Sequence, residues 1–355
     1  MKTGKLKILA LCLVITLSAL WLTLQLGRAQ RAPLWEEKIA AAELMDRCMQ
    51  QIREYQKDLG IPLTPEDLHQ TGLLGPRYTE ITTTLGPQEA KRTTADPQMA
   101  ALVVELMREA GVSSGDCVGA AFSGSFPALN LAVLSACAAM EVDVVYIASV
   151  GASTYGATWP QLTFPEIAFR LVEDGLLPTQ SAAYSLGGDG DLGLNMDPAA
   201  VADIQARMAR TQIPCIYEED YESNVAKRME IYDTQGPISC FIGVGGNQTT
   251  GGIGEDTLGW GVLTGLEREP AGPGSGLMQR YGAQGMPVIH LLNVKQLVAD
   301  YGLPYDPATP IPIGEGPLFL PIQYPKWPAA CALFACSLIL FFGFHKQWFF
   351  GHKEV

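Results

Sequence analysis

The stretch VGAAFSGSFPALNLAVLSACAAM, residues 118–140, predicts a β-strand, a tight turn and an α-helix in direct succession. Its apolar run breaks at Ser123, Gly124 and Ser125 and then resumes with the three- and four-residue spacing of a helix. Gly124 allows a sharp turn, and either serine can accept a hydrogen bond from the first free N–H groups of the helix. We therefore expect a helix N-terminus at this turn, where a carboxylate or a phosphate binds favourably.

Similar punctuation recurs along the middle of the chain. Further apolar, β-type runs cover residues 142–149, 181–186, 213–217 and 238–244, and each ends in a polar or Gly-rich loop. A last run of this type covers residues 286–292 and precedes a helical pattern. Helical patterns at residues 198–210 and 223–232 lie between them. Strands that alternate with helices predict an α/β fold with a largely parallel open sheet and flanking helices, in a Rossmann-like three-layer arrangement. Because the carboxyl ends of parallel strands meet at one edge, we expect one site built from these loops.

Both ends of the chain predict membrane segments. Residues 8–26 carry no charge and are long enough to cross a hydrocarbon core of about 30 Å, and residues 327–344 are also uncharged. The first segment can instead be a signal peptide, since Ala29 is the small residue that cleavage needs. Lysines before the first segment and after the second place both termini in the cytoplasm by the positive-inside rule. We therefore expect a membrane-anchored protein whose main domain is extracytoplasmic.

Composition divides the chain into five predicted segments. A dense series of prolines from Pro304 to Pro328 indicates an extended linker between the main domain and the second membrane segment. The segments are residues 1–31 (cytoplasmic tip and transmembrane helix), 32–112 (helical and Thr-rich part of the outer domain), 113–303 (α/β domain), 304–326 (Pro-rich linker) and 327–355 (transmembrane helix and cytoplasmic tail).

Charge is unevenly distributed. Residues 32–325 hold 16 Lys and Arg against 36 Asp and Glu, a net charge of −20, whereas the whole chain carries −13. Such a surface disfavours nucleic acid as a partner and repels a polyanion unless a local basic pocket or a cation intervenes. Five cysteines lie outside the membrane segments without any CxxC spacing, so we expect buried thiols rather than a disulfide framework.

Two constellations suggest chemistry, and each has a plainer alternative. Ser123 or Ser125 can act as a nucleophile with His290 as its base, although AFSGS does not match the GxSxG elbow and a capping serine and an ordinary strand histidine explain the same residues. Asp189 and Asp191, in the run DGDLGLNMD, offer oxygen ligands to a hard cation such as Ca²⁺, but Asp197 before Pro198 is also a helix cap. No other cofactor is indicated.

Polar loops supply the candidate ligand-binding residues. The loop GGNQTTGG, residues 245–252, offers amides, hydroxyls and backbone N–H groups to a peptide-like or carboxylate ligand, or is simply a Gly-rich turn. Upstream, the Thr-dense residues 75–86, with Lys91 and Arg92 soon after, combine hydroxyls with basic groups that can hold a carboxylate, or form an exposed strand. The expected ligand-binding residues are Ser123, Gly124, Ser125, Ser153, Gly245, Gly246, Asn247, Thr249 and Thr250.

Several runs together resemble a known bacterial family. GDCVGAAFSGSFPALN, VGASTYGATWPQLTFPE, SLGGDGDLG, YEEDYESNVAKRMEIY and FIGVGGNQTTGG are similar to the poly-γ-glutamate system protein family, and they cover most of the outer domain. The resemblance supplies no active-site residues. It implies an accessory protein of the bacterial cytoplasmic membrane that handles the γ-glutamyl polymer, or its synthesis and export components. Polymer synthesis itself needs ATP and the sequence contains no P-loop motif, so an accessory role in export, retention or processing follows more easily than synthesis. The alternative is an extracytoplasmic hydrolase or transferase of γ-glutamyl amide bonds that uses Ser123 or Ser125 with His290.

Overall fold

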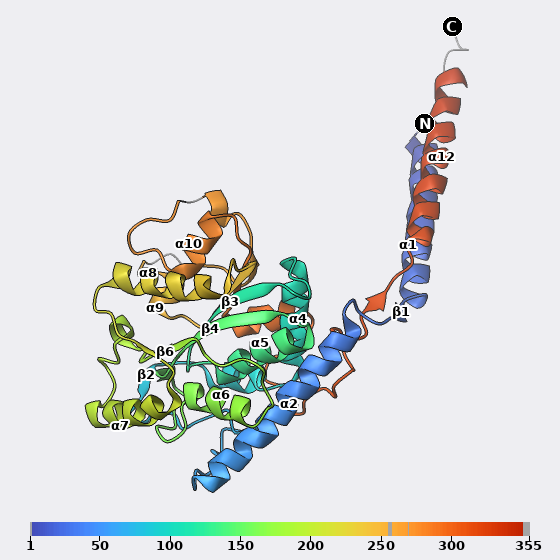
Figure 1. The fold of residues 1–355 in the computed structure, drawn as a ribbon. Coiled ribbons are helices and arrows are strands. Elements are labelled where there is room, and N and C mark those ends of the chain that lie inside the picture. Colours follow the sequence, from blue (N-terminus) through green and yellow to red (C-terminus); the bar gives the residue numbers. More distant parts are fainter. Residues whose placement is uncertain (1, 255–257, 269, 351–355) are drawn as a thin grey trace. The chain divides into compact units, whose positions relative to one another are not determined.

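The computed structural model describes residues 2–254, 258–268 and 270–350, and the chain forms two compact units (Figure 1). One unit is Pro33–Phe319, and the other joins Met1–Ala32 to Leu320–Val355. Apart from Ala32, the predicted segments 32–112 and 113–303 thus lie in one unit. Each unit is described by itself.

The larger unit contains a seven-stranded sheet, which confirms a mixed α/β fold. Its strand order is β7-β6-β4-β3-β8-β10-β9, and every neighbouring pair is parallel except β10 and β9, which are antiparallel. The mostly parallel sheet follows the prediction from the alternating pattern. The strands are β3 (Cys117–Phe122), β4 (Asp143–Ser149), β6 (Ala183–Ser185), β7 (Cys215–Ile216), β8 (Cys240–Val244), β9 (Gly261–Leu263) and β10 (Val288–Leu291).

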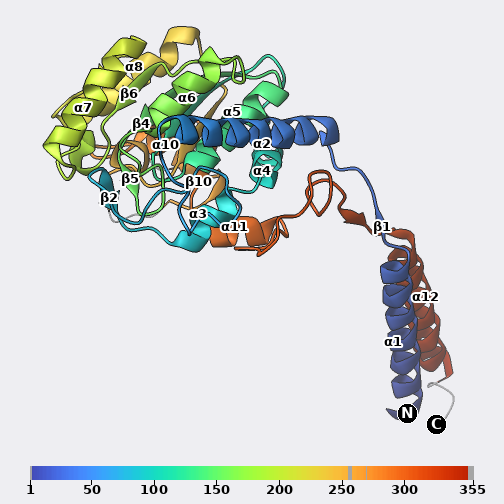
Figure 2. The same cartoon turned by 90° about the horizontal axis from the view of Figure 1, so that it is seen from below.

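Helices cover both faces of this sheet (Figures 1 and 2). Along β3, Val118, Ala120 and Phe122 belong to one buried hydrophobic cluster, whereas Ala121 belongs to another, as the alternation of side chains in a strand requires. The first cluster includes side chains of α2 (Trp35–Asp58), α4 (Gln98–Glu109), α5 (Pro127–Ala139) and α6 (Phe164–Glu173), and the second includes those of α8 (Tyr221–Tyr232) and α10 (Leu277–Ala283).

Local signals explain several helix boundaries. The expected cap of α7 (Pro198–Met208) is confirmed, because Asp197 Oδ1 accepts hydrogen bonds from Ala199 N at 2.9 Å and Ala200 N at 3.0 Å. At α6 a capping box forms, in which Glu166 Oε2 accepts from Thr163 N at 2.9 Å. The remaining α-helices in the described part of this unit are α3 (Gln88–Thr94), α9 (Gln248–Gly251) and α11 (Val294–Asp300).

The order of the strands creates a switch point between β3 and β8. From β3 the chain adds β4, β6 and β7 on one side, and it then returns to add β8 and β10 on the other side. The loops after β3 and β8 therefore leave the sheet in different directions, which opens a crevice at the carboxyl edge of the sheet. This is the edge at which the sequence predicts the site.

A second, two-stranded sheet brings the Thr-dense region to the same edge. In it β2 (Thr82–Thr84) pairs in parallel with β5 (Ala152–Ser153), directly after β4. Thr154 N also donates to Thr84 O at 2.9 Å. A segment that precedes the main sheet by more than thirty residues thus becomes part of the rim of the crevice.

The first part of the predicted linker 304–326 packs on the larger unit instead of extending freely. Leu318 and Phe319 are buried in its hydrophobic core. Asp306 forms a bidentate ion pair with Arg92, at 2.7 Å and 2.5 Å. The prolines restrict the backbone of this segment. The apolar side chains between them pack against the larger unit because burial of apolar surface away from water is favourable.

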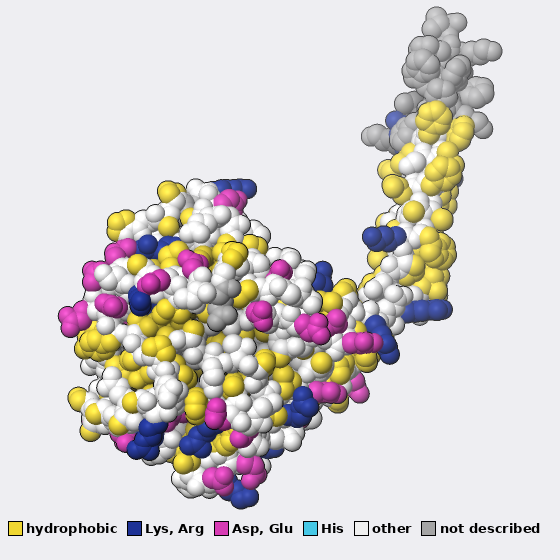
Figure 3. Space-filling view, in the orientation of Figure 1, with side chains coloured by type: hydrophobic (Ala, Val, Ile, Leu, Met, Phe, Trp, Pro, Cys, Tyr) yellow, Lys and Arg dark blue, Asp and Glu magenta, His cyan; other side chains and the backbone are white. Residues whose placement is uncertain are grey.

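The smaller unit contains the terminal helices α1 (Lys2–Gln25) and α12 (Trp327–Phe350), which pack side by side. Before α12, β11 (Ile322–Gln323) pairs in antiparallel fashion with β1 (Arg28–Ala29). Hydrophobic side chains predominate on the visible face of the coloured part of the helix pair, with a few Lys and Arg side chains among them (Figure 3). Within the described residues, one helix segment, Lys5–Gln25, is long and apolar enough to cross a membrane, as a membrane anchor or a signal sequence does, whereas the apolar part of α12, Trp327–Gly343, has 17 residues.

Candidate functional site

A cavity of about 380 Å³ with a mixed polar and apolar lining lies at the carboxyl edge of the main sheet. Its walls come from the loops after β3, β4, β6, β8 and β10 and from the segment that runs from β2 into α3. The lining residues are Thr83, Thr84, Leu85, Gly86, Pro87, Lys91, Ser123, Ser125, Phe126, Ser149, Gly151, Ser153, Gly188, Asp189, Gly246, Asn247, Gln248 and Leu292. Eight of these eighteen residues carry a hydroxyl or amide side chain, and apolar side chains such as Leu85, Phe126 and Leu292 lie among them. A mostly apolar lining with several polar groups suits a ligand whose amide and carboxylate groups need specific partners.

Gly124 shapes the turn after β3 by allowing a close backbone approach. A Cβ atom at this position would lie 2.5 Å from Val150 O and 2.9 Å from Gly151 O, so a larger residue would push the β3 and β4 loops apart. The expected serine cap of α5 is wrong, because the helix is preceded by Phe126 and no side chain caps it. Ser123 Oγ instead accepts from Ser125 N at 3.2 Å.

Lys91 is the most unusual residue of the cavity. Its side chain is buried, and Nζ donates to Ser153 Oγ at 2.8 Å and also to the backbone oxygen of Ser125. The ammonium lies 3.5 Å from the centroid of the Phe126 ring, a cation–π contact. Three segments, α3, the β3–α5 turn and β5, thus meet at one amine.

Burial without a counter-charge changes the protonation of Lys91. Desolvation lowers the pKa of this amine to about 7, and among the described residues no carboxylate pairs with it. Lys91 is also the only positively charged side chain among the described residues that line the cavity. At neutral pH the cavity therefore holds a lysine that is present both as ammonium and as free amine.

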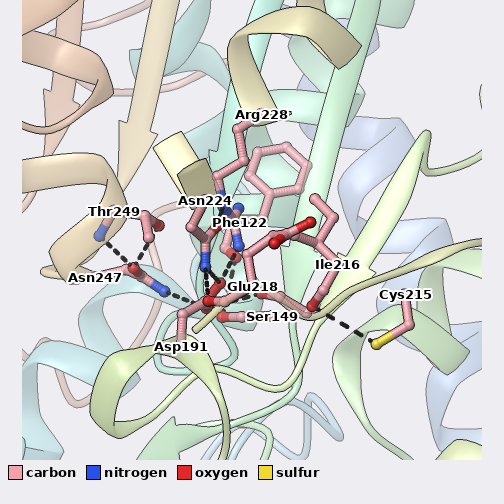
Figure 4. Close-up of polar contacts among 11 residues, drawn as sticks. Phe122, Ser149, Asp191, Cys215, Ile216, Glu218, Asn224, Arg228, Asn247 and Thr249 are labelled. Atoms are coloured by element: carbon pink, nitrogen blue, oxygen red, sulfur yellow. Dashed lines mark hydrogen bonds and ion pairs between the residues drawn. The ribbon is translucent and has the colours of Figure 1, made fainter. Parts of the chain in front are cut away.

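Behind the cavity, a buried ion pair fixes the loop after β6 (Figure 4). Asp191 pairs with Arg228 of α8, and the side chains are 1% and 3% exposed. Asp191 Oδ1 also accepts from Ser185 Oγ at 2.9 Å and from Asn247 Nδ2 at 3.3 Å. Since Asn247 lines the cavity, this cluster couples α8 to the wall of the site.

This cluster accounts for the carboxylates that suggested a metal ion. The Asp191 carboxylate is already occupied by Arg228, Ser185 and Asn247, while Asp189 is exposed at the rim of the cavity. Within the described residues, no three His, Cys, Asp or Glu side chains come together as a metal site. Of the two expected metal ligands, only the Asp189 carboxylate is free of such contacts. The structure therefore does not bring Asp189 and Asp191 together as two ligands of one cation.

The expected serine–histidine pair does not form either. His290 is buried, and its ring nitrogens lie 2.7 Å from Gly259 O and 3.2 Å from Gly245 O, so they face backbone carbonyl groups instead of Ser123 or Ser125. A neutral imidazole donates only one of these hydrogen bonds, and burial lowers the pKa of His290. His290 therefore holds the loops after β8 and before β9 together.

The expected ligand-binding residues divide into two groups. Ser123, Ser125, Ser153, Gly246 and Asn247 line the cavity, so the structure brings the loops after β3, β4 and β8 together as expected. The others are not among its described lining residues, and they support the fold: Gly124 by close approach, Gly245 as acceptor for His290, and Thr249 and Thr250 as buried residues of α9.

The expected ligand-binding residues do not include Lys91, Ser149 and Gln248, which also line the cavity. For Lys91 a signal existed, since a basic residue close to a Thr-dense segment suggested carboxylate binding. What no local pattern indicates is its burial, which depends on the distant Ser125 and Ser153.

Comparisons with protein-family models, with curated proteins and with solved structures found no match to this chain. The function is therefore argued from the chemistry of the site.

Proposed function

We propose that the chain is a membrane-anchored accessory protein of bacterial poly-γ-glutamate synthesis or export, and that its α/β unit binds the γ-glutamyl polymer outside the cytoplasmic membrane. The observation that carries this proposal is Lys91, a buried lysine that lines a cavity with several hydroxyl and amide groups and has no carboxylate partner among the described residues. Its ammonium form offers a carboxylate a charge-assisted hydrogen bond, while the hydroxyls and amides suit the polymer's amide bonds. The resemblance of the loop sequences supplies the identity of the polymer.

The acidic balance of the domain restricts how the polymer is held. Residues 32–325 carry a net charge of −20, so a long polyanion is repelled from most of the surface. A cavity of about 380 Å³ with one lysine suits a short piece of chain, such as an end. Contacts with the rest of the polymer then fall to a basic synthesis or export component, or to bridging cations such as Ca²⁺.

We also propose that both terminal helices cross the cytoplasmic membrane, with both termini in the cytoplasm. The length and apolar character of Lys5–Gln25 support this for α1. The apolar part of α12 has 17 residues, which is at the short end of the length range of transmembrane helices. Its packing against α1 supports the insertion of the two helices as a pair. The helices on both faces of the sheet in turn support a Rossmann-like, three-layer reading of the α/β unit.

The proposed topology predicts that Cys215 reacts from outside the cell. This cysteine is exposed in the α/β unit, contrary to the burial expected from sequence, while Cys48, Cys137 and Cys240 are buried. In spheroplasts that express the full chain, we expect a membrane-impermeant maleimide to label Cys215, and Cys215→Ser to lose most of this labelling. Labelling that requires lysis of the membrane would place the α/β unit inside.

The binding proposal predicts a preference for the γ-linkage. In calorimetric titrations of the full chain in detergent, we expect a short γ-linked glutamate oligomer to bind at least about 10-fold more tightly than the α-linked oligomer of equal length and charge. The two ligands differ in the spacing of their amide and carboxylate groups, so only one spacing matches the positions of the polar groups in the cavity. Repeating both titrations with Ca²⁺ shows whether a bridging cation contributes to the affinity. Equal affinities, or no binding, would contradict the proposal.

A second candidate function is acyl transfer at amide bonds, in place of simple binding. The 2.8 Å contact between Lys91 Nζ and Ser153 Oγ favours it, and it involves different residues from those that the sequence suggested.

A further inference from the structure

The hydroxyl that contacts Lys91 is in a different situation from the other serines of the cavity. Ser153 Oγ lies 2.8 Å from Lys91 Nζ, and both residues are buried while lining the cavity. Ser149 Oγ donates to Phe122 O at 3.3 Å, so its proton is committed to the backbone. The Ser123 and Ser125 hydroxyls accept from backbone N–H groups, and no basic side chain contacts them in the described part of the chain.

Ser125 holds both members of this pair in place. Its backbone oxygen accepts from Lys91 Nζ, and its Oγ accepts from Ser153 N at 2.9 Å. Behind Ser153, the pairing of β5 with β2 fixes the backbone. The side chains that must meet are thus positioned by neighbouring backbone, as a nucleophile and its base require.

The amine has a protonation state that suits a base. Desolvation lowers the pKa of Lys91 to about 7, so a substantial share is unprotonated at neutral pH. The charged groups of the surrounding segments are Glu89, Arg92 with its partner Asp306, Lys295 of α11, and Asp189 at the rim, and none of them causes this shift. A neutral amine can donate to Ser125 O and still accept the proton of Ser153 Oγ.

From this geometry we propose that Ser153 and Lys91 are a nucleophile and its general base, and that the cavity performs acyl transfer on an amide. Ser153 Oγ attacks the carbonyl carbon and forms a C–O bond, while its proton moves to Lys91 Nζ. The C–N bond then breaks, Lys91 returns the proton to the leaving nitrogen, and an ester remains on Ser153. Water or an amine attacks this ester, with Lys91 taking its proton, and Ser153 Oγ regains a proton from Lys91 as it leaves.

The surroundings also favour the negative charge that develops on the carbonyl oxygen. The cavity-lining Phe126 directly precedes α5, a 13-residue helix whose N-terminus has no side-chain cap. The positive end of the helix dipole stabilises negative charge in its vicinity. The nature of the acyl group, a γ-glutamyl chain, rests on the function proposed above, whereas the pair itself does not.

The test uses the full chain in detergent and a fluorophosphonate, a reagent that phosphonylates activated serines. We expect one added label, located at Ser153 by peptide mass, with a rate that rises as the pH increases through 7. Ser153→Ala and Lys91→Met should both lose labelling by at least about 100-fold. Ser114→Ala, which removes an exposed hydroxyl away from the cavity, should label like the wild type.

Lys91→Arg separates the two roles of the lysine. Arginine stays protonated, so it keeps a positive charge in the cavity but cannot act as a base at neutral pH. We expect this variant to lose fluorophosphonate labelling and, if it melts like the wild type, to keep binding the γ-linked oligomer. Labelling of another residue, or undiminished labelling of Lys91→Met, would overturn the proposal.

Incubation with the γ-linked oligomer separates this inference from the proposed function. Shortened or transferred chains, lost in Ser153→Ala, support both. Labelling at Ser153 without binding of the oligomer supports Ser153 and Lys91 as nucleophile and base, and it contradicts the proposal that the ligand is a γ-glutamyl chain. Binding without labelling and without any change in chain length leaves a binding protein and overturns the pair.

Discussion

Replacing Asp191 with asparagine is expected to lower the free energy of unfolding by about 3–5 kcal/mol. The change leaves the Arg228 guanidinium, 3% exposed, buried without its counter-charge. Asparagine has nearly the volume of aspartate and tolerates the left-handed backbone of residue 191, where φ is 65°, so the loss reports on charge and not on packing or strain. Denaturant unfolding of the full chain in detergent, followed by tryptophan fluorescence, measures the difference.

Asp203→Asn is the matched control for this prediction. Asp203 is 69% exposed, and its partner Arg207 keeps a second carboxylate, Glu166, at 2.6 Å, so the loss should stay below about 1 kcal/mol. Adding Arg228→Met to Asp191→Asn removes the unpaired charge and should recover part of the stability. If Asp191→Asn and Asp203→Asn cost the same, the buried pair does not stabilise the fold.

The class of the fold and the edge of the sheet that holds the site were predictable from the sequence. Strand periodicity and helix spacing are local properties, so residues 118–140 already contain β3, the turn and α5 in the right order. The rule that parallel strands end at one edge then places Ser123, Ser153 and Asn247 around one crevice. The structure brings these three residues together as cavity lining.

The partners of individual side chains were not predictable, because they depend on contacts between distant segments. Asp191 resembles a metal ligand within its own loop, and only the fold brings Arg228 of α8 against it. His290 resembles a catalytic histidine at a strand end, but the loops around it supply two carbonyl acceptors. Similarly, Lys91 becomes a buried group only because β2 pairs with β5 and carries the following helix to the cavity.

Gly124 shows the same limit on a smaller scale. The sequence identifies the turn correctly and attributes the glycine to backbone freedom. In the structure the requirement is steric, because the backbone of the β4 loop at Val150 and Gly151 leaves no space for a Cβ atom. A glycine at position 124 was predictable from the turn, whereas the steric reason that requires it depends on the loop after β4.

Lys91→Met is expected to weaken binding of the γ-linked oligomer by about 10- to 100-fold, since a hydrogen bond to a charged group contributes about 1.5–3 kcal/mol. Methionine has a similar length and fits beside the Phe126 ring, so the cavity keeps its shape. Calorimetric titration of the full chain in detergent measures the loss. Lys227→Met removes the same charge from a half-exposed lysine outside the cavity, and it should bind like the wild type.

The pH dependence of the wild type gives this prediction a sign. The ammonium form of Lys91 binds the carboxylate, and its pKa is lowered to about 7, so affinity should fall as the pH rises above 7, while the variant shows no such step. Stability should change in the opposite direction. The unfolded chain holds the proton up to the ordinary lysine pKa of about 10.4, so the wild type becomes more stable between pH 7 and that value. Since methionine carries no charge into the cavity, Lys91→Met should be at least as stable as the wild type at pH 7. If Lys91→Met binds the γ-linked oligomer as tightly as the wild type, Lys91 is not the group that recognises the ligand.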